Sequence, residues 1–64
     1  MDPVQTFNDL TTAFIAQEWV DAKQHAFDLL DWLAKGGFFP LDRQSTVGYC
    51  VTIERICRSH IERS

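Results

Sequence analysis

Glycine, proline and positive charge are all scarce in this sequence. It contains three glycines, two prolines and no internal repeat or low-complexity tract. Its apolar runs stay well short of the ~18 residues that a membrane-spanning helix requires. Six basic residues are outnumbered by nine acidic ones, so the net charge is −3, whereas nucleic-acid-binding domains normally carry a basic surface. We therefore expect neither a membrane nor a nucleic acid as a partner.

Cysteine is also scarce, because the chain has only Cys50 and Cys57. Neither belongs to the close cysteine pairs that zinc sites use. On one helix, seven residues separate two Cα atoms by about 10 Å, which is too far for a disulfide. A secretory leader would need a basic residue before an apolar run. This sequence begins Met1-Asp2-Pro3 and has no such residue there. We therefore expect a cytoplasmic protein with reduced thiols.

Apolar residues recur at spacings of three, four and seven in three segments, which predicts helices over residues 3–16, 18–35 and 43–62. No glycine or proline marks the end of the first helix. We expect the corner at Gln17-Glu18, where the turn would be tight. The fold predicted from this pattern is all-α: a three-helix bundle with successive helices antiparallel, forming a single domain over residues 1–64.

Capping residues support these boundaries. Asp2 is a suitable N-cap for the first helix, and Pro3 suits the first helical position. Gly36 follows the second helix, where a left-handed C-terminal cap is expected. Either Asp42 or Ser45 can act as the N-cap of the third helix.

The helix predicted over residues 18–35 is apolar around well over half of its circumference at ~100° per residue. A surface helix of a small bundle needs an apolar stripe of only about 100°. The following segment, residues 36–40, reads Gly-Gly-Phe-Phe-Pro and adds two aromatics to the same small core. Chains below ~70–80 residues commonly gain stability from a partner subunit. We therefore expect another chain to cover part of this surface.

These observations predict a small, non-enzymatic interaction or regulatory protein that acts through a hydrophobic helical surface. We expect it to self-associate as a homodimer or a higher oligomer and to need no cofactor. Aromatic side chains bury the most area and dominate interface energetics. The predicted interface residues are therefore Trp19, Trp32, Phe38, Phe39, Phe27 and Tyr49.

Two alternative functions stay open. In one, the protein is a monomeric adaptor that binds a helix or peptide of another protein in a groove. In the other, Cys50, Cys57 and His60 form a zinc or thiol site, since cysteine and histidine bind zinc and an imidazole can activate a thiol. A tetrahedral zinc site needs four ligands, and His25 is the remaining candidate.

Charge is distributed unevenly along the chain. Residues 1–35 carry six acids and two lysines, a net charge of −4, whereas residues 36–64 carry three acids and four arginines, a net charge of +1. Opposite charges on two parts of a surface can orient two copies or guide a charged partner.

Overall fold

The computed structural model describes residues 2–63, so the first and last residues of the predicted domain lie outside the described range. It contains three helices: α1 spans Pro3–Ile15, α2 spans Trp19–Ala34 and α3 spans Arg43–Arg63. Each boundary lies within one residue of its predicted position. The prediction of an all-α, three-helix fold is therefore confirmed.

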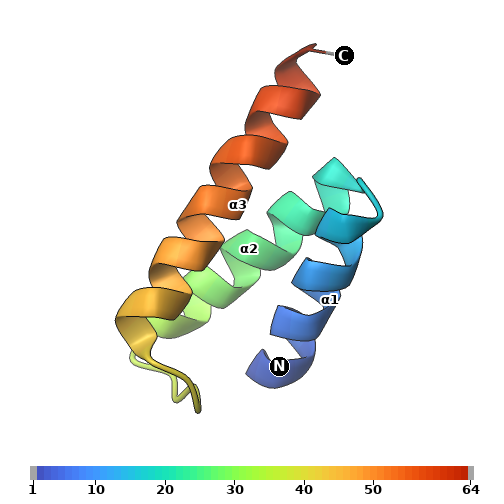
Figure 1. Ribbon diagram of the computed structural model, residues 1–64. Helices are drawn as coiled ribbons and strands as arrows, with labels where there is room; N and C mark the ends of the chain where they lie inside the picture. Colours follow the sequence, from blue (N-terminus) through green and yellow to red (C-terminus); the bar gives the residue numbers. More distant parts are fainter. Residues whose placement is uncertain (1, 64) are drawn as a thin grey trace.

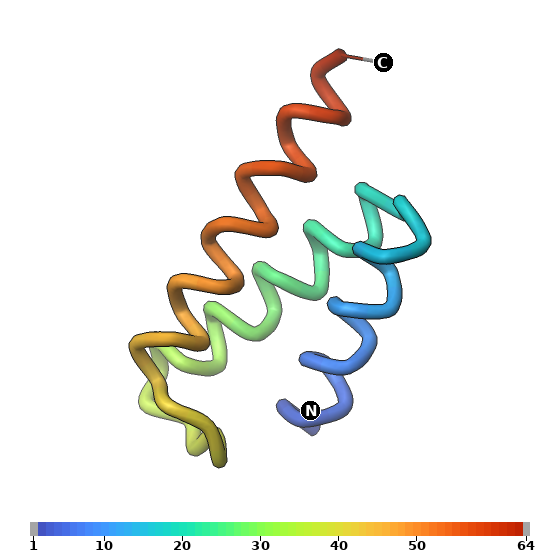
Figure 2. Tube along the Cα trace, viewed as in Figure 1, coloured from blue at the N-terminus to red at the C-terminus, as the bar shows by residue number. Residues whose placement is uncertain are grey.

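The helices form an antiparallel bundle in which α2 packs against both α1 and α3 (Figure 1). The trace in Figure 2 runs along α1, reverses into α2 and reverses again into α3, whose C-terminal end lies far from the α2–α3 connection. Among residues 2–63, no helix combines the length and the apolar composition needed to cross a bilayer.

The core lies along one side of α2, where Ala22 and Ala26 are followed by Leu29 and Leu33. All four side chains are almost completely buried. Because alanine adds little volume, neighbouring helices can approach α2 closely at these positions. Among residues 2–63, the buried apolar side chains are Leu10, Ala13, Ala22, Ala26, Leu29, Leu33, Phe39, Cys50, Ile53 and Cys57.

The first corner is tight because Gln17 adopts a left-handed backbone conformation, with φ of 61°. Its N–H donates to the Phe14 carbonyl at 3.1 Å, and the Glu18 N–H donates to the Ala13 carbonyl at 2.9 Å. This pair of hydrogen bonds is the Schellman motif, which satisfies the last carbonyls of a helix. The chain therefore reverses direction without a glycine.

The second corner has the same motif with glycines in it. Gly36, with φ of 82°, donates to the Leu33 carbonyl, and Gly37 donates to the Trp32 carbonyl. The predicted left-handed cap at Gly36 is thus confirmed. The Trp32 indole lies against Gly37, where an added Cβ would be only 2.3 Å from an indole carbon. The Trp32 Nε1–H also donates to the Phe38 carbonyl at 2.9 Å.

The start of α3 is tied to the end of α2. The Asp42 carboxylate accepts a hydrogen bond from the Ser45 N–H at 2.8 Å, which identifies Asp42 as the N-cap. This hydrogen bond holds the pKa of Asp42 below its ordinary value, because it stabilises the charged carboxylate. The Arg43 guanidinium donates to the Leu33 carbonyl at the end of α2.

Candidate functional site

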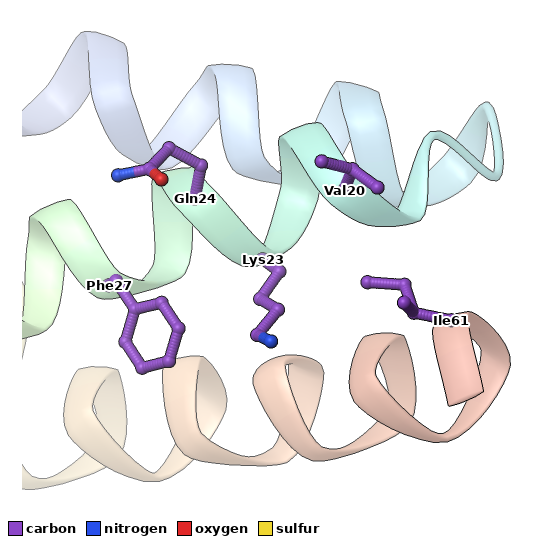
Figure 3. A pocket seen from close by; sticks show the side chains of 5 residues that line it. All are labelled: Val20, Lys23, Gln24, Phe27 and Ile61. Carbon is purple, nitrogen blue, oxygen red and sulfur yellow. The ribbon is translucent and has the colours of Figure 1, made fainter.

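An open groove lies between the N-terminal half of α2 and the C-terminal end of α3, and we call it the α2–α3 groove (Figure 3). Val20, Lys23, Gln24 and Phe27 of α2 line it, together with Ile61 of α3. Its volume is about 330 Å³, and its lining is mainly apolar. In Figure 3 the Phe27 ring and the Lys23 side chain point from α2 toward α3, and Ile61 points back from α3.

The spacing of the α2 residues explains why they form one wall. Positions 20, 23, 24 and 27 follow the helical spacing of three, four and seven, so they share one side of α2. The core residues of α2 have the same periodicity but occupy a different side of the helix. As a result α2 carries two stripes, and the bundle covers only one of them. In the other stripe, Val20 is 67% exposed and Phe27 is 46% exposed.

Lys23 gives the groove a positive charge next to its aromatic wall. Its ammonium lies 5.7 Å from the centre of the Phe27 ring, which is within the range of a cation–π interaction. On α3, the largely buried Glu54 carboxylate lies 4.0 Å from the Arg58 guanidinium. Burial, followed by the negative charge of Glu54, raises the pKa of the Cys57 thiol, and the positive charge of Lys23 partly opposes that shift. Lys23 and Glu54 therefore both lie near the same buried thiol.

The cysteines belong to the core and not to the groove surface. Cys50 and Cys57 are both buried, and neither forms a disulfide. Burial raises the pKa of the Cys50 thiol to about 11, so at neutral pH this side chain is a protonated, covered thiol. Within residues 2–63, no three histidine, cysteine or acidic side chains come together as metal ligands. The structure therefore does not bring Cys50, Cys57 and His60 together as a metal site.

The phenylalanines among the predicted interface residues differ widely in exposure. Phe38 is 78% exposed at the second corner, and Phe27 is half exposed in the α2–α3 groove. Phe39 instead lies in the core, where its ring centre is 5.6 Å from that of Phe7. Two of these three phenylalanines can therefore meet another chain without any rearrangement.

The other three predicted interface residues are half-buried, and each has a partner within the chain. Trp19 stacks on His60, with the ring centres 4.0 Å apart and the planes within 3° of parallel. The Tyr49 hydroxyl lies 2.9 Å from Thr11 Oγ1, which links α3 to α1. Trp32 holds the second corner as described above. Whether any of the six predicted residues lies in an interface stays a prediction.

The predicted interface residues are all aromatic and do not include the aliphatic side chains of the exposed surface. Val20 and Ile61 line the groove, and the spacing of Val20 relative to Phe27 was the signal that could have identified it. Outside the groove lining, further exposed aliphatic side chains are Val4, Ile15, Leu41, Val51 and Ile56.

A scan against protein-family models, a search of curated proteins and a search of solved structures each find no match to this chain. Its function is therefore inferred from its own exposed side chains and charges.

Proposed function

We propose that this is a small, non-enzymatic interaction or regulatory protein that self-associates through the surface around the α2–α3 groove. The observation that carries the proposal is the exposure of Val20 and Phe27, at 67% and 46%, directly beside a packed core. Covering apolar surface contributes about 25 cal/mol per Å² removed from water. Apolar side chains that gather on one surface commonly mark an interaction site.

The helices that border the groove favour a second copy of the chain as the partner. α2 contains three aspartates and one lysine, for a net charge of −2 with histidine neutral. α3 contains four arginines and two glutamates, for a net charge of +2. One copy therefore offers both signs of charge beside an apolar strip, and a second copy offers their complement.

The size of the molecule limits the strength of this association. Its longest face measures 35 × 17 Å. Such a face has a footprint on the order of 600 Å², so a pair would bury on the order of 1,200 Å², at the lower end of specific interfaces. Interfaces at the low end of this range often belong to weak or transient complexes, so we expect a dissociation constant of about micromolar magnitude.

The second corner offers a separate apolar surface. Phe38 and Leu41 are 78% and 57% exposed there, at the end of α2 that lies opposite the groove. We propose the groove surface for the dimer contact, and an oligomer larger than a dimer would also use the corner.

We also propose that the protein works in the cytoplasm. Its two cysteines are both free and buried. Small secreted domains usually rely on disulfides for stability, whereas reduced thiols are typical of the cytosol.

Sedimentation equilibrium between about 1 and 200 µM tests self-association. We expect the wild type to form dimers and Val20→Gln to weaken the dimer at least about fivefold, because a polar side chain would replace apolar surface in the contact. Ile15→Gln is the matched control, since Ile15 is 75% exposed but lies on α1 outside the groove lining. Its dissociation constant should stay within about twofold of the wild-type value.

A wild-type chain that remains monomeric at 200 µM would overturn the self-association proposal. That outcome would favour the adaptor function, in which the same groove accepts a helix of a different protein.

A further inference from the structure

We infer that the two copies pair with α2 of each chain over α3 of the other, about a two-fold axis that runs along the helices. The inference rests on the proposed function, because it specifies how the groove surfaces of two copies pack against each other. A two-fold interface is isologous, so the same surface of both chains takes part in it.

When the helices of the two copies are aligned with one another, a surface made of two antiparallel helices allows two face-to-face, two-fold arrangements. With the axis along the helices, each α2 lies over the partner's α3. With the axis across the helices, α2 lies over α2 and α3 lies over α3. The second arrangement would place a charge of −2 against −2 and +2 against +2, whereas the first pairs opposite charges. Like charges across an interface disfavour an arrangement.

Contacts between α2 and α3 show which of their residues lie level with one another. Val20 and Ile61 line the same groove, and Arg43 donates to the Leu33 carbonyl. By interpolation, Asp28 lies about level with Cys50 on α3.

The same alignment puts Arg55 about level with Gln24, one helical turn, or about 5 Å, from the level of Asp28. An axis along the helices preserves these levels in the partner. The Asp28 carboxylate of one copy is therefore within reach of the long Arg55 side chain of the other.

Asp28 lies beside the groove lining on α2, and Arg55 lies on the exposed side of α3. The Asp28 carboxylate accepts a hydrogen bond at 3.0 Å from the amide of Gln24, which lines the groove one turn earlier. Arg55 lies three residues before Arg58, which lies three residues before Ile61 of the groove. Asp28 and Arg55 are both exposed, so reversing their charges leaves the core unchanged.

Charge reversal measured by sedimentation equilibrium tests the arrangement. We expect Asp28→Lys and Arg55→Glu each to weaken the dimer about tenfold, because each substitution acts twice in a two-fold pair. The combined variant carries both reversals and should recover to within about threefold of the wild type. Raising the salt concentration from 50 to 500 mM should weaken the wild-type dimer, since exposed charge pairs are screened.

Asp9→Lys is the matched control for Asp28→Lys. Asp9 lies on α1, away from the groove, and accepts a hydrogen bond from the amide of Gln5 four residues earlier, as Asp28 does from Gln24. The two substitutions also change the net charge equally. Asp9→Lys should therefore leave the dissociation constant within about twofold of the wild-type value.

The outcomes separate this arrangement from self-association itself. If the wild type dimerises but Asp28→Lys, Arg55→Glu and Asp9→Lys all behave like it, the pairing of α2 with α3 is wrong while self-association stands. Failure of the combined variant to recover would also contradict the arrangement. A wild type that is monomeric at all concentrations would instead overturn the proposed function.

Discussion

The two corners of the chain end their helices with the same hydrogen bonds but differ in what else they do. At the α1–α2 corner, Gln17 provides the left-handed residue, and the motif simply reverses the chain. At the α2–α3 corner, Gly36 provides it, while Gly37 leaves room for the indole of Trp32. The first corner is a local turn, whereas the second is fastened by side chains from two helices.

This difference matters for function because the α2–α3 groove depends on how α3 lies along α2. The Trp32 indole N–H donates a hydrogen bond to the Phe38 carbonyl, and the Arg43 guanidinium donates one to the Leu33 carbonyl. These contacts fix the start of α3 relative to the end of α2. The α2–α3 corner, where the Trp32 indole packs against Gly37, therefore positions α3 along α2 and with it the groove.

Gly37→Ala should have the largest effect on stability among single changes at the corners. The new Cβ would lie 2.3 Å from a carbon of the rigid Trp32 indole, so the ring must move and lose its hydrogen bond to Phe38. Overpacking of this kind typically costs about 1–3 kcal/mol. Urea unfolding measures the free-energy change, and tryptophan fluorescence should report the displaced ring. A Gly37→Ala protein as stable as the wild type would show that the indole does not hold this corner.

Gly36→Ala makes the same chemical change one residue earlier and should cost less, about 1 kcal/mol. Nothing lies within 4 Å of a Cβ added at Gly36, so its only cost is the left-handed backbone at φ of 82°. That conformation costs an L-residue about 1–2 kcal/mol, and a lower unfolded-state entropy returns part of it. The tryptophan spectrum should stay unchanged in this variant. A loss larger than that of Gly37→Ala would reverse the assignment of roles to the two glycines.

Helix boundaries were predictable from the sequence, and contacts that depend on the path of the chain beyond a helix were not. The helix boundaries follow from apolar spacing and from capping residues such as Asp2 and Gly36, which act on their own neighbours. Gln17 gave no such signal, because glutamine has no preference for positive φ. The contact between Trp32 and Gly37 depends on the path of the chain after α2, which spacing along the helix does not contain.

The candidate site shows the same limit. The wide apolar arc of α2 predicted surplus apolar surface, and the exposed Val20 and Phe27 are part of it. Which stripe stays uncovered depends on where α1 and α3 dock, which is a tertiary property. For this reason spacing alone did not predict that Phe39 lies in the core or that the aliphatic Ile61 lines the groove. Self-association through this surface stays a prediction.

Gln17→Gly should have the smallest effect and the opposite sign, a gain of up to about 1 kcal/mol. Glycine adopts the left-handed conformation at φ of 61° without the strain that glutamine bears, although its greater freedom in the unfolded chain offsets part of the gain. Because Gln17 is exposed and its backbone hydrogen bonds remain available, no packing should change. Thermal unfolding followed by circular dichroism measures the shift. A loss of stability would mean that the Gln17 side chain supports the first corner, and the two corners would then be more alike than their contacts indicate.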